Sequence, residues 1–133
     1  MSTRNFFRYW LPLIAYCALI FILSSQPLPE KVPVFFGVDK VMHAAAWTVL
    51  GILCFRAFQS RWSQAKPSAI VALSVVASVL FGISDEFHQS FVPSRTADIR
   101  DLVFDFLGSI VGSGICRLFY AKSAKIHPRV TLR

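Results

Sequence analysis

Residues 99–120 read IRDLVFDFLGSIVGSGICRLFY, an apolar stretch with three charged residues close to its start. Asp98, Asp101 and Asp105 are spaced i, i+3 and i+7, so they share one face of a helix, and Gly108 and Gly112 continue that face. The other faces carry Leu, Val, Phe and Ile, and small residues let membrane helices approach one another closely. The stretch therefore predicts a membrane helix whose acidic and then glycine-bearing face points into a bundle.

Three further apolar runs precede this one. A helix needs about 20 residues to cross the hydrocarbon core, and we expect four transmembrane helices at about residues 6–25, 40–58, 67–86 and 99–120. Apolar residues make up 55% of the chain and charged residues only 16%, where a soluble domain has roughly 25% charged residues. This composition excludes a soluble or disordered chain. We predict a single all-α domain over residues 1–133, a polytopic integral membrane protein with a mobile basic tail from about residue 121.

The basic residues predict the orientation of these helices. The chain has 14 Lys and Arg against 7 Asp and Glu, and ten of the basic residues lie before or at the start of the first run, between the end of run two and run three, or at the end of run four and after it. The positive-inside rule therefore places the N- and C-termini in the cytoplasm. We expect no nucleic acid partner, since the sequence shows no basic helix face and no aromatic RNA-binding motif.

The acidic residues gather at the predicted outer end. Six of the seven acids lie there, together with two of the three histidines. Asp39 and His43 are spaced i, i+4, whereas Asp85 is three residues before His88 and four before Gln89. Three helices therefore bring titratable side chains to one end of the bundle, and we predict a polar pocket there.

The same residues carry a family resemblance. The run Asp39-Lys40-Val41-Met42-His43, with Leu50-Gly51 after it, resembles the D-K-x-x-H…L-G signature of the VanZ-like family. The run SDEFHQSFVPSR at 84–95, followed by Asp98, Asp101, Gly108 and Gly112, resembles the second signature of that family, and Ser24-Ser25-Gln26 is also similar. The resemblance implies a small four-helix protein of the bacterial cytoplasmic (inner) membrane. The family is named from a protein linked to teicoplanin resistance, and most of its members have no settled activity.

Three positions depart from the family pattern. Trp47 stands where Tyr is usual, Ser94 where Gly is usual, and Asp105 where Asn is usual. The first removes a hydroxyl group and the last adds a charge, so a mechanism does not transfer directly from other members.

We expect the outer pocket to bind or modify a lipid, a glycan or a lipid-linked wall precursor. His88 is the candidate acid or base near neutral pH, and Asp85 and Glu86 are candidates for orienting it or positioning water. Arg95 offers a guanidinium fork for phosphate or carboxylate. The candidate substrate-binding residues are Asp39, His43, Gln89, Asp98, Asp101 and Asp105, with Ser25 and Gln26 beside Ser24 at the rim.

Several alternatives stay open at this stage, including whether the protein is an enzyme. It could be a non-catalytic binding or shielding protein, for a wall precursor or a glycopeptide, or a proton- or cation-linked transporter. His88 could simply bond to Asp85, and Arg95 could pair with Asp98 or Asp101. The expected partners are membrane lipids and a second copy of the chain through Gly108 and Gly112. No cofactor or metal is expected, because no H-x-x-x-H or similar spacing occurs, although His43, His88 and three aspartates could hold a divalent ion.

The predicted topology can be tested by reporter fusions. Alkaline phosphatase fused in the Phe91-Val92-Pro93 turn should be active, and a fluorescent protein fused after residue 122 should fold in the cytoplasm, because ten basic residues hold that side inside. The opposite pattern of activities would refute the orientation.

Overall fold

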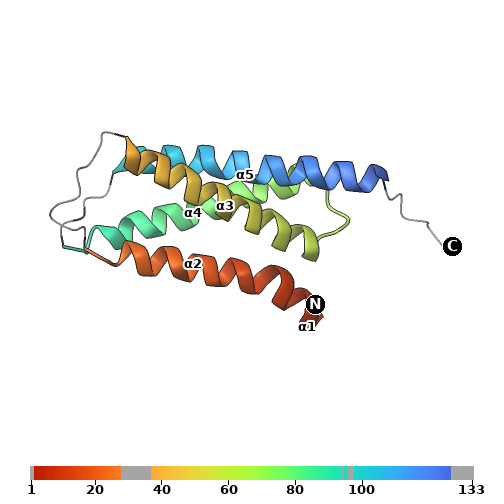
Figure 1. Cartoon of the computed structure of the whole chain (residues 1–133), viewed down its shortest axis with the longest axis horizontal. Coiled ribbons are helices and arrows are strands. Elements are labelled where there is room, and N and C mark those ends of the chain that lie inside the picture. Colours follow the sequence, from red (N-terminus) through yellow and green to blue (C-terminus); the bar gives the residue numbers. More distant parts are fainter. Residues whose placement is uncertain (1, 28–36, 94, 96–97, 127–133) are drawn as a thin grey trace.

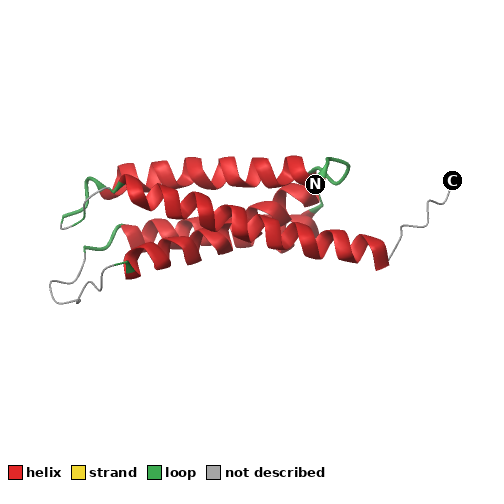
Figure 2. Ribbon diagram, turned by 90° about the horizontal axis from the view of Figure 1, so that it is seen from above, coloured by secondary structure: helices red, strands yellow, loops and turns green. Residues whose placement is uncertain are grey.

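The computed structural model describes residues 2–27, 37–93, 95 and 98–126, and of residues 123–126 it describes the backbone only. The first helical rod consists of α1 (Thr3–Asn5), the π-helical turn η1 (Phe6–Trp10) and α2 (Leu11–Ser24). It is followed by α3 (Val38–Arg61), α4 (Pro67–Gln89) and α5 (Ile99–Ile126). Figures 1 and 2 show these rods running alongside one another, with α1 and the end of α5 at the same end of the bundle.

The predicted spans are confirmed. Four helices, Thr3–Ser24, Val38–Arg61, Pro67–Gln89 and Ile99–Lys122, are long and apolar enough to cross a membrane. The protein is therefore all-helical and multi-pass. The predicted tail is wrong in its first part, because α5 continues through Ala121 and Lys122 to Ile126, and both residue types favour helix. Residues 127–133 lie outside the described part of the chain.

A proline shapes the first rod. Pro12 has no backbone N–H, and its ring clashes with the carbonyl group four residues earlier in a regular α-helix. The helix widens just before it, where the Leu11 N–H donates to the carbonyl of Phe6, five residues back. The π-helical turn therefore accommodates the proline without ending the span.

Glycines bring α3 and α5 together. A Cβ atom built on Gly108 would overlap the carbonyl oxygen of Ala44, and one built on Gly112 would overlap that of Thr48. The small face of α5 thus packs inside the bundle, as predicted from its spacing. The same contact corrects our expectation of a homo-oligomer through Gly108 and Gly112, because α3 of the same chain already occupies this face.

Small side chains also fill the interior. Ser74, Ser78, Ser109 and Ser113 are fully buried in the structure. The hydroxyl groups of Ser74 and Ser113 donate to carbonyl oxygens four residues earlier in their own helices, both at 2.7 Å. Because these hydroxyl groups are satisfied locally, the helices can pack closely without leaving polar groups exposed to lipid.

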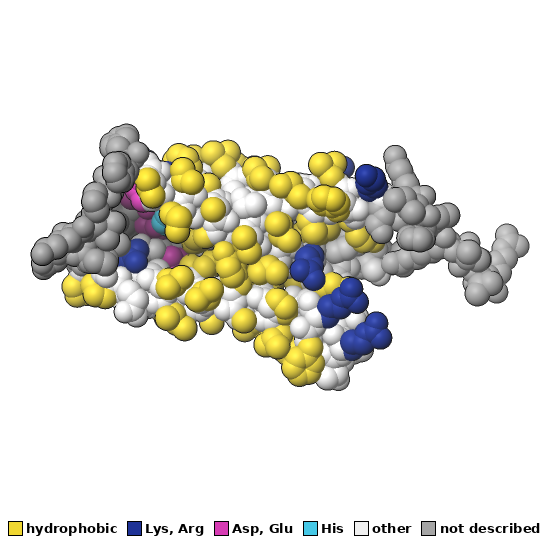
Figure 3. Space-filling model, in the orientation of Figure 1, with side chains coloured by type: hydrophobic (Ala, Val, Ile, Leu, Met, Phe, Trp, Pro, Cys, Tyr) yellow, Lys and Arg dark blue, Asp and Glu magenta, His cyan; other side chains and the backbone are white. Residues whose placement is uncertain are grey.

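The outside of the bundle is apolar. Leu80, Leu118 and Phe119 are among many large hydrophobic side chains that stay exposed, at 61%, 71% and 70%. Figure 3 shows hydrophobic side chains over most of the visible surface, with basic side chains grouped at the right-hand end. Such a surface fits a lipid environment.

We expect Gly112→Ala to lower the free energy of unfolding by roughly 1–3 kcal/mol, because the new methyl group forces α3 and α5 apart. Thermal unfolding in detergent, followed by gel filtration, measures the effect. Gly114→Ala is the matched control, since a Cβ atom there meets nothing within 4 Å and alanine favours the helix. Equal stability of the two variants would contradict the close α3–α5 contact.

Candidate functional site

The candidate site lies at the end of the bundle where α2 and α4 end and where α3 and α5 begin. It contains four buried acids, namely Asp85, Glu86, Asp101 and Asp105. A buried carboxylate is costly unless it is paired or hydrogen-bonded. Figure 3 shows acidic side chains and histidine in a recess at the left-hand end, opposite the main group of basic side chains. The grouping predicted from the sequence is therefore present.

Lys40 connects α3 to the start of α5. Its Nζ atom lies 3.1 Å from Asp39 and 2.8 Å from Asp98, and it also contacts Asp101. Asp98 additionally pairs with Arg100 at 3.1 Å. The Arg100 guanidinium and the Lys40 ammonium hold the pKa of Asp98 well below its usual value. Lys40 was not among the candidate site residues expected from the sequence, although it is the central partner of these acids.

His43 lies deeper along α3 and is held by two aspartates of α5. Its Nδ1 atom lies 2.9 Å from Oδ1 of Asp105, and its Nε2 atom lies 3.6 Å from Oδ2 of Asp101. The imidazole ring also stacks on the indole of Trp47, with centroids 5.5 Å apart. A carboxylate bound to one ring nitrogen orients an imidazole for work at the other nitrogen.

Asp85 bonds to Gln89, as their i, i+4 spacing indicated, and also to a residue of α2. Its Oδ1 atom accepts a short hydrogen bond from the hydroxyl of Ser24 in α2, and its Oδ2 atom accepts one of 2.7 Å from Nε2 of Gln89. Asp85 therefore ties α2 to α4. Ser24 is the residue of the Ser24-Ser25-Gln26 run that reaches the site.

His88 does not bond to Asp85 among the described residues, although their i, i+3 spacing indicated such a bond. Its ring stacks on Phe21 of α2, with centroids 4.1 Å apart, and its Nδ1 atom has no hydrogen-bond partner among the described residues. No bond to Asp85 is found there, because Ser24 and Gln89 already occupy that carboxylate. The expected His88–Asp85 pair is therefore wrong.

Arg95 acts first as a link to α2. It donates from Nε to the carbonyl of Gln26 at 3.0 Å and from Nη2 to the carbonyl of Leu23 at 3.1 Å. The last carbonyl groups of a helix lack intrahelical partners and favour a positive charge. An ion pair of Arg95 with Asp98 or Asp101, the alternative from the sequence, is not found in the described part of the chain. The Nη1 atom makes a long contact of 3.5 Å with Gln89.

The expectation that the side chains of Ser25 and Gln26 lie at the rim of the pocket is also corrected. The hydroxyl of Ser25 donates to the carbonyl of Phe21, and the amide of Gln26 donates to that of Ile22. Both side chains turn back along α2 and do not line the pocket. Their polar groups bind carbonyl groups in the last turn of α2.

A pocket of about 220 Å³ opens beside this network. Its walls come from α2, α3 and α4 and from the connection to α5: Ile20, Leu23, Ser24, Met42, His43, Ala46, Trp47, Asp85, Gln89 and Arg95. A larger cavity of about 440 Å³ lies at the opposite end of the bundle, lined by Arg56, Gln59 and Tyr120 among others. The smaller pocket is the candidate site, because titratable groups meet there and the larger one has no carboxylate in its lining.

Glu86 and Asp105 each have one carboxylate oxygen without a hydrogen-bond partner in the described part of the chain. Glu86 accepts the backbone N–H of Asp98 on Oε2 at 2.9 Å, but its Oε1 atom is buried without a partner among the described residues. The Oδ2 atom of Asp105 is likewise buried without a hydrogen-bond partner among these residues. This end of the bundle therefore holds carboxylate acceptor atoms, an oriented imidazole and a guanidinium group.

We expect Asp85→Ala to lower the free energy of unfolding by about 1–3 kcal/mol, because the Ser24 hydroxyl and the Gln89 amide lose their buried acceptor. Thermal unfolding in detergent checks this. Ser84→Ala is the control, since Ser84 is exposed and bonds only to the carbonyl of Phe81 in its own helix. A variant at Asp85 as stable as this control would show that the α2–α4 link contributes nothing.

Comparison with known proteins adds one match. No curated protein and no solved structure gives a significant match to the chain. The sequence model of the VanZ/LLP1 family matches residues 4–120, which reach into all four membrane-spanning helices and include every side chain of the site. The resemblance seen in the signature residues is thereby confirmed, and the chain belongs to the VanZ/LLP1 family.

Proposed function

We propose that the protein binds the polar headgroup of an envelope lipid or lipid-linked wall precursor in the pocket at the outer end of the bundle. The observation that carries this proposal is the mixed lining of the pocket. Ile20, Leu23 and Met42 form an apolar side, whereas Asp85, Gln89 and Arg95 form a polar side. An amphiphile has the same division between its tail and its headgroup.

The exposure of the pocket walls supports a ligand that comes from the membrane. Leu23 and Met42 are 58% and 66% exposed on the apolar outside of the helices. A lipid tail lying there would stay in the hydrocarbon while its headgroup reached the pocket. By this proposal the site faces outward from a bacterial cytoplasmic membrane, in agreement with the basic residues at the other end.

The polar side fits a phosphate that is linked to a hydroxyl-bearing group. Arg95 uses Nε and Nη2 on α2, so Nη1, with its long contact of 3.5 Å to Gln89, is the donor best placed for an anionic oxygen. Gln89 offers an acceptor oxygen for a hydroxyl group. Binding of a wall precursor in this way would be sufficient to reduce access by a glycopeptide antibiotic of the teicoplanin type.

Modification of the bound headgroup would need an acid or base, and the geometry favours His43 over His88 for that role. His43 lines the pocket and is oriented by Asp105, whereas His88 stacks on Phe21 outside the pocket lining. Substitution of His43 would then abolish turnover, whereas in a binding protein it would only change affinity.

Ala46→Phe tests the proposal, because the phenyl ring fills the space between α2 and α3 where the ligand would lie. We expect lipid binding to weaken by tenfold or more, about 1.4 kcal/mol. Native mass spectrometry of the purified protein with phosphatidylglycerol and with an isoprenoid phosphate measures the bound fraction. Envelope lipids and wall precursors of the variant strain can be profiled in parallel with a deletion strain.

Ala45→Phe is the matched control for this test. Ala45 is the preceding residue of α3, is exposed, and does not line the pocket. The control should bind lipid like the wild type. Equal binding by both variants, or no binding of either lipid by the wild type, would refute a headgroup site in this pocket.

A further inference from the structure

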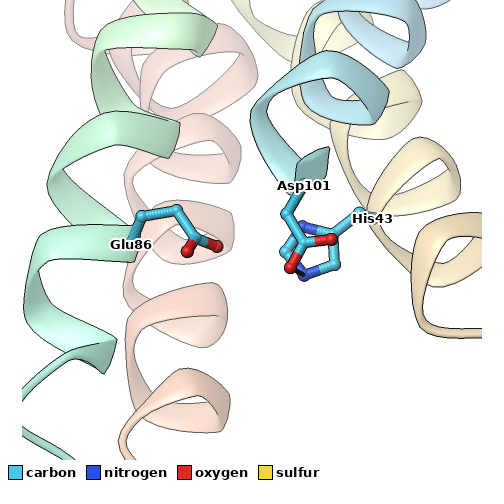
Figure 4. Close-up of side chains that lie close together, drawn as sticks. All are labelled: His43, Glu86 and Asp101. Carbon is cyan, nitrogen blue, oxygen red and sulfur yellow. Dashed lines mark ion pairs between the residues drawn. The ribbon is translucent and has the colours of Figure 1, made fainter. Parts of the chain in front are cut away.

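Three side chains from three helices converge beside the pocket. Figure 4 shows Glu86 of α4 pointing toward Asp101 of α5 and His43 of α3. Each offers one ligand atom, and these atoms all lie within 4.8 Å of one another. Glu86 and Asp101 are buried, and His43 is partly buried.

The state of Glu86 distinguishes this arrangement from an ordinary ion-pair network. The residue is 7% exposed, and its Oε1 atom has no hydrogen-bond partner among the described residues. An unpaired buried carboxylate oxygen is costly. Because the side chain points toward His43 and Asp101, the missing partner belongs in the space between these three residues.

The surroundings of His43 match those of a metal-bound imidazole. Metal-ligating histidines commonly bind a carboxylate through the other ring nitrogen, which fixes the ring. Here Nδ1 is held by Asp105 at 2.9 Å, and Nε2 remains on the side of Asp101. Asp101 in turn contacts Lys40 through Oδ1, so its Oδ2 atom is the one that faces His43.

Among the described residues, the Lys and Arg side chains that pair with acids at this end are fewer than the acids. Asp39, Glu86, Asp98, Asp101 and Asp105 lie at this end, and their pairs with Lys and Arg are made by Lys40 and Arg100. Neither of these cations pairs with Glu86 or Asp105 in the described residues. A further positive charge between Glu86 and Asp101 would reduce the excess of negative charge.

We propose that His43, Glu86 and Asp101 bind a divalent transition-metal ion such as Zn²⁺ or Mn²⁺, with Asp105 as the residue that positions His43. Bonds from nitrogen and oxygen to such an ion are about 2.0–2.2 Å, so opposite ligands are about 4.4 Å apart at most. The observed spacing, within 4.8 Å, needs only a small closure of the side chains. Imidazole together with carboxylates favours these ions over Ca²⁺ and Mg²⁺, which take oxygen ligands.

Such an ion would add a function to the pocket. His43 belongs both to the pocket lining and to the ligand set, so an ion with three protein ligands would present open coordination positions next to the ligand space. There it would bind and polarise a phosphate or carboxylate oxygen. The metal site itself does not depend on the headgroup proposal: a protein that binds the metal but no lipid would refute only the latter.

The test uses the full chain, purified in detergent and stripped of metal by a chelator. Equilibrium dialysis against Zn²⁺ or Mn²⁺ alone, with elemental analysis, should give one ion for each chain. Co²⁺ should also quench the fluorescence of Trp47, whose ring stacks on His43. Trp47→Phe should remove this quenching, because Trp10 and Trp62 are placed toward the other end of the helices.

Substitutions distinguish the proposed metal ligands from residues that only lie near them. Glu86→Gln and His43→Gln should weaken binding by at least tenfold, and Asp105→Asn, which changes the residue behind His43, by roughly 10–100-fold. His88→Gln is the control, since it removes a histidine of the same end that stacks on Phe21. No saturable binding by the folded wild type would overturn the proposal, as would wild-type affinity in folded Glu86→Gln. If that variant does not fold, the wild type still decides: Trp47 fluorescence that Co²⁺ does not quench would also overturn the proposal.

Discussion

A carboxylate that is buried within the span of a membrane needs a partner, and in this protein the partners come from other helices. Asp85 of α4 is satisfied by Ser24 of α2, and Asp101 of α5 by Lys40 of α3. Asp105 of α5 is held by His43 of α3. The hydrocarbon contains no water that could hydrogen-bond an unpaired charge. Each of these bonds is therefore needed, and each holds one helix against another.

Two packing devices therefore work at different depths of the same bundle. Toward the middle, the glycines of α5 let α3 approach until backbone touches backbone. At the end where α3 and α5 begin, longer polar side chains bridge the helices. The pocket of about 220 Å³ lies beside these bridges, and its lining comes from α2, α3, α4 and Arg95.

The polar groups at this end differ in how completely they are hydrogen-bonded. Lys40 pairs with aspartates, and Arg95 donates from Nε and Nη2 to the carbonyl groups of Gln26 and Leu23, so these donors join one segment of the chain to another. Glu86 and Asp105 keep oxygens without partners in the described part of the chain. Each such buried oxygen costs stability, and the proposed metal ligand Glu86 and its neighbour Asp105 are distinguished from Lys40 and Arg95 in this respect.

Helical periodicity and hydropathy by themselves determined the four apolar spans, the inward face of α5 and the gathering of acids at one end, and the signature residues indicated the family. These properties depend on the order of residues along single helices, which the sequence contains directly. Partner choice across helices was decided only by the tertiary structure. His88 and Asp85 are three residues apart, yet His88 stacks on Phe21 and Asp85 bonds to Ser24, because α2 packs against that face of α4. Arg95 likewise reaches the end of α2, and Glu86 meets His43, through the positions and side-chain lengths that the folded bundle imposes.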